Sequence, residues 1–182
     1  MAVTAIIWRR LDQPGHDSAR LTESASGAVL EGTAVFSESG RPCRLEYRVD
    51  CDTSWRTVSA RAAGWLGAES IDINITVNPE REWTLNARPC ASVQGSDDVD
   101  LSFTPATNVL PIRRLGLGIG TRALVQAAWL DFPSLVLAPL RQAYERVAES
   151  NYLYQSDGGF NALLETNGAG FITRYPGLWQ RE

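Results

Sequence analysis

The sequence predicts a mainly β fold made of consecutive antiparallel strands. Many stretches alternate apolar and polar residues with a period of two, the pattern of a strand with one buried face. These stretches recur at short intervals, with turn residues between them, and no helical pattern of about 10–15 residues separates them as it would in βαβ units. No fixed-period repeat or low-complexity linker divides the chain, so residues 1–182 are expected to form a single domain.

The individual strands can be placed along the whole chain. The clearest covers residues 43–51, where Leu45, Tyr47 and Val49 share one face. Asn167–Gly168 is the strongest short-range hairpin signal. The other expected strands cover residues 4–11, 21–36 (one or two strands), 55–63, 70–77, 82–86, 121–131, 141–148, 152–155, 160–165 and 170–175.

Two further segments are harder to assign. Residues 116–120 contain three alternating glycines but no lysine and none of the later spacing of a phosphate-binding loop. We therefore expect a strand kept narrow by glycine, which allows a sheet to curve closely. Residues 133–144 could hold a short helix, although Leu135–Leu137 is β-prone.

Length and composition are those of an ordinary globular protein. The chain has 182 residues, of which 44% are hydrophobic and 21% are charged, so it can bury a sizeable core. Its net charge of −4 disfavours a nucleic-acid-binding surface, because such surfaces are normally basic. No apolar run approaches the roughly 20 residues of a membrane span, and the apolar run near the N-terminus is too short for a signal peptide. A cytoplasmic location is expected, and the oligomeric state is left open.

The histidine and cysteine residues do not indicate a metal or catalytic site. His16, the single histidine, lies in a predicted turn without a glycine-flanked serine nucleophile, so we interpret it as a solvated loop residue. Cys43, Cys51 and Cys90 lack metal-binding spacing and are expected to be reduced thiols, with a Cys43–Cys51 bridge as the alternative. We therefore assign no catalytic residue, no metal ion and no cofactor.

The stretch from Asp97 to Leu115 is the most polar segment that is also interleaved with core residues. In an extended segment Asp98 and Asp100 leave the same face, and such a pair can bind a divalent metal or act as acid and base in glycoside hydrolysis. Arg113 and Arg114 would point to opposite faces of a strand, and one of them could reach back to an aspartate as a buried ion pair. We favour this structural clamp over catalysis.

The same stretch carries a family resemblance. Asp98–Leu115 resembles the signature of the bacterial putative glycolipid-binding proteins, long classed as a domain of unknown function. Further segments match the family's pattern in the same order: Leu45–Asp50, Trp55–Thr57, Ala128–Pro133, Tyr144–Arg146, Tyr152–Tyr154 and Tyr175–Trp179. The resemblance implies a spiral β-roll, in which one long antiparallel sheet curls around one or two short helices. It also implies a shape similar to that of lipoprotein carriers that enclose an apolar cavity.

The resemblance and the aromatic residues together suggest a ligand. The six tryptophans and five tyrosines could line a cleft for sugar rings or acyl chains, or could fill the core of the curled sheet. We expect non-enzymatic binding of an amphiphile, such as a glycolipid or other lipid, in an apolar and aromatic cavity. The alternatives are an enzyme that acts on a sugar or sugar–lipid through Asp98 and Asp100, and a module that meets a protein partner through its sheet edges. The candidate ligand-binding residues are Trp65, Asp98, Asp100, Thr107, Asn108, Arg113, Arg114, Trp129, Tyr144, Tyr152 and Tyr154.

Overall fold

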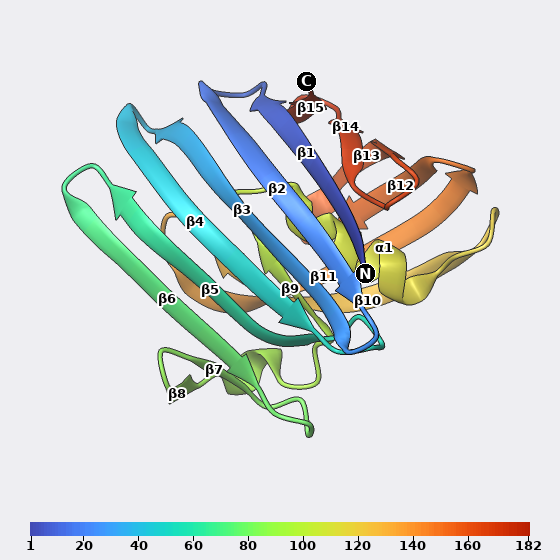
Figure 1. Cartoon of the computed structure of the whole chain (residues 1–182), viewed down its shortest axis with the longest axis horizontal. Coiled ribbons are helices and arrows are strands. Elements are labelled where there is room, and N and C mark those ends of the chain that lie inside the picture. The colour runs from blue at the N-terminus through green and yellow to red at the C-terminus, as the bar shows by residue number, and fades with distance from the viewer.

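The computed structural model describes residues 1–182 and contains one 15-stranded sheet with one short α-helix (Figure 1). The first half holds β1 (Ala2–Arg10), β2 (Gly15–Ser24), β3 (Gly27–Glu38), β4 (Arg41–Cys51), β5 (Thr57–Leu66), β6 (Glu69–Val77), β7 (Trp83–Leu85), β8 (Arg88–Pro89) and the 3-10 helix η1 (Ala91–Val93). The second half holds β9 (Asp98–Leu101), η2 (Ala106–Asn108), α1 (Val109–Leu115), β10 (Arg122–Asp131), β11 (Val136–Ala148), β12 (Asn151–Ser156), η3 (Asp157–Gly159), β13 (Phe160–Thr166), β14 (Ile172–Tyr175) and β15 (Trp179–Arg181).

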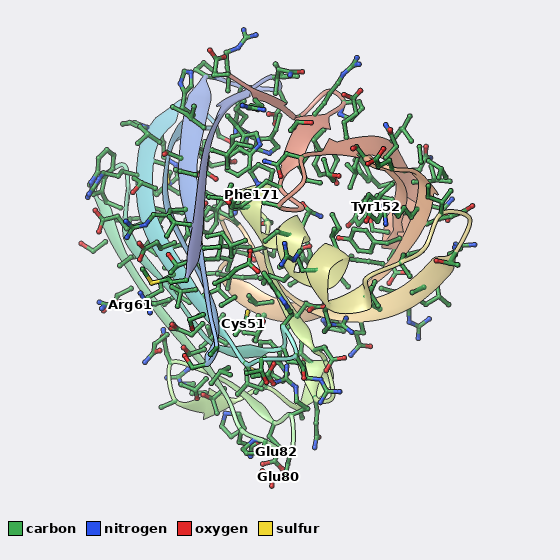
Figure 2. All side chains as sticks on the ribbon, turned by 45° about the vertical axis from the view of Figure 1, so that its right-hand side comes forward. Cys51, Arg61, Glu80, Glu82, Tyr152 and Phe171 are labelled. Carbon is green, nitrogen blue, oxygen red and sulfur yellow. The ribbon has the colours of Figure 1, made fainter.

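The sheet consists of two meanders that meet at β1. The strand order is β8-β7-β6-β5-β4-β3-β2-β1-β15-β14-β13-β12-β11-β10-β9, so the final strand pairs with the first. Neighbouring strands are antiparallel except for β9 and β10, which are parallel. Figures 1 and 2 show the sheet curled so that its two halves face each other across α1. The predicted mainly β fold and the roll implied by the resemblance are both confirmed.

The core is formed by the faces that the alternation of apolar residues predicted. In β4 the side chains of Leu45, Tyr47 and Val49 are buried, and in β6 the four aliphatic residues from Ile71 to Val77 are buried. These residues belong to one cluster of 41 buried residues that spans both halves of the sheet. Burial of apolar surface is the main stabilising term in folding, so this shared cluster holds the curled sheet together.

Trp8 and Phe171 connect the first strand to the C-terminal meander. Their rings pack edge to face with centroids 5.6 Å apart. Trp8 Nε1 also donates a hydrogen bond to the carbonyl of Ile172 at 2.5 Å. Figure 2 shows Phe171 between the two halves of the roll.

The expected helix at 133–144 is wrong, because β11 begins at Val136. Pro139 is tolerated in this strand because it lies where β11 pairs with β10 on one side, before the pairing with β12 starts at Gln142. The β-branched and aliphatic residues around it therefore continue as a strand.

The helix of this fold lies instead within the polar stretch. Pro111 is the third residue of α1. The N–H groups of the first helical turn have no hydrogen-bond acceptor within the helix, so proline, which lacks an N–H, is tolerated there. Gly116 follows with φ +53°, the left-handed conformation that commonly ends a helix. Residues 116–120 therefore connect α1 to β10, and the narrow strand expected there is wrong.

Smaller corrections concern β2, β4 and β5. His16 is an exposed residue of β2 and does not lie in a turn. Strand β5 starts at Thr57, two residues later than expected, because residues 52–56 form the connection from β4. Cys43 and Cys51 are free thiols on the same strand, eight positions and about 27 Å apart, so they cannot form a bridge.

Candidate functional site

The polar stretch folds back on itself, so that its two ends meet. Asp98 lies on β9 and Arg114 lies in the last turn of α1. Arg114 donates from Nε to Asp98 Oδ1 at 3.0 Å and from Nη2 to Oδ2 at 2.6 Å. Burial raises the pKa of Asp98, and the hydrogen bonds and charge of Arg114 act against that rise. The expected ion pair is present, and it fully engages both carboxylate oxygens.

Arg113 makes a separate connection to the first half of the chain. Its Nη2 lies 2.5 Å from Glu23 Oε2, and its guanidinium lies 4.5 Å from the centre of the Trp55 ring. Its Nη1 donates to the carbonyl of Ala169 at 3.3 Å. Arg113 therefore ties α1 to β2, to the β4–β5 connection and to the β13–β14 loop.

The outer side of β9 is closed by two threonines. The N–H of Val99 donates to Thr57 Oγ1 at 3.0 Å, and the N–H of Leu101 donates to Thr107 Oγ1 at 3.3 Å. Thr107 is buried, and its hydroxyl accepts a hydrogen bond from the backbone of an edge strand. The N–H groups of Val99 and Leu101 are therefore not free to pair with a further strand.

Asp100 differs from Asp98 in its surroundings. Gln142 Nε2 donates to Asp100 Oδ2 at 2.6 Å, and no side chain or backbone group of the protein bonds to Oδ1. Every fully enclosed side-chain polar atom has a partner, so Oδ1 keeps some accessible surface, and Asp100 lines the adjoining cleft. Burial raises the pKa of Asp100 to about 6, while the hydrogen bond from Gln142 acts to lower it.

This cleft lies between the polar stretch and the C-terminal strands and has a volume of about 290 Å³. Its aromatic walls come from Trp129, Tyr154, Phe160, Tyr175 and Trp179. Its polar groups come from Asp100, Ser102, Thr104, Asn108, Ser156 and Asp157. Flat apolar faces and several hydrogen-bonding groups therefore surround one space.

The aromatic walls are held by packing against one another. The rings of Tyr154, Phe160 and Tyr175 form a triangle with centroid distances of 6.0–6.1 Å. Tyr144 packs behind Tyr154 at 5.1 Å. Edge-to-face and tilted contacts of this kind favour fixed ring orientations, so the cleft has preformed walls.

A chain of hydrogen bonds runs behind these walls to Asp100. Asn108 Nδ2 donates to Tyr144 Oη at 2.9 Å, and the Tyr144 hydroxyl donates to Gln142 Oε1 at 3.3 Å. Gln142 then donates to Asp100. Each member is oriented by the next, so the carboxylate is held in one position facing the cleft.

Comparisons with known proteins agree with this structure. The model of a family described as "Putative glycolipid-binding" matches residues 5–181. The chain belongs to this family. A crystal structure of a DUF1089 family protein from Pseudomonas aeruginosa has the same fold, with a TM-score of 0.81 and 29% identity over 91% of this chain and 92% of that chain. No curated protein sequence matches this chain.

The structure of this family member brings part of the predicted site together. Asp100, Asn108, Trp129 and Tyr154 line the cleft, and Tyr144 supports it from behind. The remaining predicted residues have other positions or partners: Asp98, Thr107, Arg113 and Arg114 hold the polar stretch, while Trp65 and Tyr152 do not line the cleft.

Trp65 and Tyr152 occupy different surroundings. Trp65 lies on β5 beside Arg44 and is 38% exposed. Tyr152 is buried inside the curl of the C-terminal strands, where Arg146 lies 5.9 Å from its ring centre (Figure 2). Sequence patterns alone could not separate these aromatic residues from the cleft walls.

Asp17 is a buried group that the sequence analysis missed. It lies on β2 with no exposed surface, and Tyr47 donates to both of its carboxylate oxygens at 3.0 and 3.1 Å. The hydroxyl of Thr104, a cleft residue, also donates to it. The alternation in β2 could have revealed it, because Asp17 is in phase with the buried residues Ala19 and Leu21.

No helix of the structure is long and apolar enough to cross a membrane.

Proposed function

We propose that this protein binds a glycolipid or a similar amphiphile without changing it chemically, and that the cleft receives the sugar ring. The observation that carries the proposal is the combination of aromatic faces and hydrogen-bonding groups around one cleft in a member of this family. Aromatic rings cover the apolar C–H faces of a sugar, and the polar groups bind its hydroxyls.

The size of the cleft limits which part of the ligand it takes. Its volume of about 290 Å³ is near the lower end of ligand pockets, which begin at roughly 300 Å³. The 41-residue cluster of buried side chains spans both halves of the sheet and lies beside this cleft. The proposed ligand therefore places its sugar in the cleft and its acyl chain outside it, next to Phe160, which is 41% exposed.

Two tryptophan variants test the proposal. Trp129→Ala removes a wall of the cleft, and Trp65→Ala removes a tryptophan of another strand that does not line it. We expect a short-chain alkyl glycoside to bind the wild-type protein and to bind Trp129→Ala about tenfold more weakly. Binding to Trp65→Ala should be unchanged in the same calorimetric titration.

The result that contradicts the proposal is equal binding to all three proteins, which would place the sugar elsewhere. Native mass spectrometry of gently extracted protein provides a second measurement. We expect a retained amphiphile in the wild type and its loss in Trp129→Ala.

A second candidate function is hydrolysis of a glycoside. The observation in its favour is that the pKa of Asp100 is raised to about 6, near the range of a general acid, and that Asp157 lines the same cleft. The pair expected from the sequence is less suitable, because Arg114 binds both oxygens of Asp98. Incubation with aryl glycosides distinguishes the two functions: a binder releases no aryl alcohol, whereas an enzyme does so and loses this activity in Asp100→Asn.

A further inference from the structure

The cleft contains negative but no positive side chains. Among its 14 lining residues, the ionisable carboxylates are Asp100 and Asp157, and no arginine, lysine or histidine is present. A third carboxylate, Asp17, lies directly behind the Thr104 hydroxyl. An approaching ligand therefore meets a negative electrostatic potential from these carboxylates.

The arginines near the cleft are already engaged. Arg114 is bound to Asp98, and Arg113 is bound to Glu23. Arg10 lies 5.2 Å from the ring centre of Trp179, but its Nε is paired with Asp12 at 2.9 Å. These cations are balanced by their partners and leave the carboxylate of Asp100 uncompensated.

Arg141 is a further cation near the rim. Its contact with Asp157 runs through its backbone N–H, which donates to Oδ2 at 3.3 Å, and its guanidinium does not line the cleft. It is an exposed residue of β11, where solvent and salt screen its charge.

We propose that the cleft selects its ligand by charge: it takes a neutral or cationic sugar headgroup, binds an amino sugar most tightly, and rejects headgroups that carry a carboxylate, sulfate or phosphate. This inference rests on the proposed function and names the class of headgroup. A protonated sugar amine donates a charge-assisted hydrogen bond to Asp100 Oδ1 and is attracted to the neighbouring aromatic faces. An anionic headgroup meets like charge in a partly desolvated space, where repulsion is strong.

Three probes with the same alkyl chain test the selection on the wild-type protein. Octyl glucosaminide is cationic, octyl glucoside is neutral and octyl glucuronide is anionic, and all are titrated calorimetrically at pH 7 below their micelle concentrations. We expect the glucosaminide to bind more tightly than the glucoside, and equal or weaker binding would contradict the preference for an amino sugar. The glucuronide should bind about tenfold or more weakly than the glucoside.

Two aspartate variants show where the selection arises. In Asp100→Asn the preference for the glucosaminide over the glucuronide should fall severalfold, because the negative charge at the floor of the cleft is gone. Asp72→Asn is the matched control: it removes the same charge from an exposed residue of β6 that is paired with Arg61, and the preference should stay as in the wild type.

The outcomes separate this inference from the function on which it rests. Equal binding of glucoside and glucuronide to the wild type overturns charge selection and leaves sugar binding intact. Binding of none of the three probes overturns both. Because the wild-type comparison needs no variant, a folding defect in Asp100→Asn does not prevent a decision.

Discussion

At the scale of single residues, three aspartates near the polar stretch are stabilised in different ways. Asp98 is paired with Arg114, Asp100 is bonded to Gln142, and Asp17 is bonded to the hydroxyls of Tyr47 and Thr104. A cation compensates the charge of Asp98, whereas neutral donors alone serve the other two. Burial consequently raises the pKa of both Asp17 and Asp100 to about 6.

We predict that Asp17→Asn changes how stability depends on pH. The pKa of Asp17 is about 6 in the folded protein against an ordinary value of 3.8, so the folded state binds the proton more tightly. The stabilisation from this proton is present at low pH and is lost as the pH rises from about 4 to about 6. The free energy of unfolding of Asp17→Asn, relative to the wild type, should therefore increase by about 2 kcal/mol between pH 4 and pH 7.

Urea denaturation at the two pH values measures this change. A difference between variant and wild type that is the same at pH 4 and pH 7 would show that the Asp17 carboxylate is ionised without a penalty.

We predict that Arg114→Met destabilises the protein by about 3–5 kcal/mol, because Asp98 is left buried and charged without its cation. Arg61→Met is the matched control, since Arg61 lies on the outer face of the sheet and its pair with Asp72 is exposed (Figure 2). The control should cost at most about 1 kcal/mol. Equal losses in the two variants, measured by urea denaturation, would mean that the Asp98–Arg114 pair has no special role.

At the scale of elements, the packing of β3 against β4 depends on a glycine, which has no side chain. Gly32 on β3 faces Tyr47 on β4, and the Tyr47 ring lies over it to reach Asp17. A Cβ at Gly32 would lie 2.4 Å from Tyr47 Oη and 2.6 Å from the carbonyl of Ser18. The glycine is required for the close approach of the ring.

We predict that Gly32→Ala destabilises the protein by about 1–3 kcal/mol, because the added methyl group forces Tyr47 and the backbone apart. Gly118→Ala is the control, since its Cβ would meet only Thr121 Cγ2 at 3.9 Å. The control should be neutral or slightly stabilising, because alanine lowers the entropy of the unfolded chain. A thermal melt in which both variants match the wild type would contradict the proposed ring placement.

The sequence predicted elements well where a local pattern repeats. Strands β4 and β6 alternate cleanly, and their buried faces are the predicted ones. Helix α1 was missed because it has only seven residues, contains Pro111 and derives its stability from burial of Val109–Ile112. The apolar pattern of α1 is too short to distinguish a helix from a turn.

At the scale of the whole molecule, both meanders share one sheet and one core cluster. The β1–β15 pair and the Trp8–Ile172 hydrogen bond join residues far apart in the chain. Neither half can therefore lose its structure without exposing the core of the other.

We predict a single cooperative unfolding transition. Tryptophan fluorescence and far-ultraviolet circular dichroism should give the same midpoint in urea, because the shared core couples the two meanders. Separate midpoints for the two signals would show that the meanders unfold independently.

The cleft shows what a sequence leaves open at this scale. Asp100, Asn108, Trp129 and Tyr154 could be proposed from residue type, and they do line it. Phe160, Tyr175 and Trp179 could not be separated from ordinary core residues, because their part in the cleft depends on the C-terminal strands curling toward η2.

The sequence by itself determined that the chain forms antiparallel strands and which faces of the clearest strands are buried. The reason is that a period-two pattern is formed by residues close together in the chain and can be read without knowing the rest of the fold. The tertiary structure decided that the polar stretch folds back through α1, that Arg114 neutralises Asp98, and that Asp100 faces an aromatic cleft. These outcomes depend on the β1–β15 pairing and the parallel β9–β10 pair. Such long-range pairings are set by the total free energy of the whole curled sheet, which no local pattern contains.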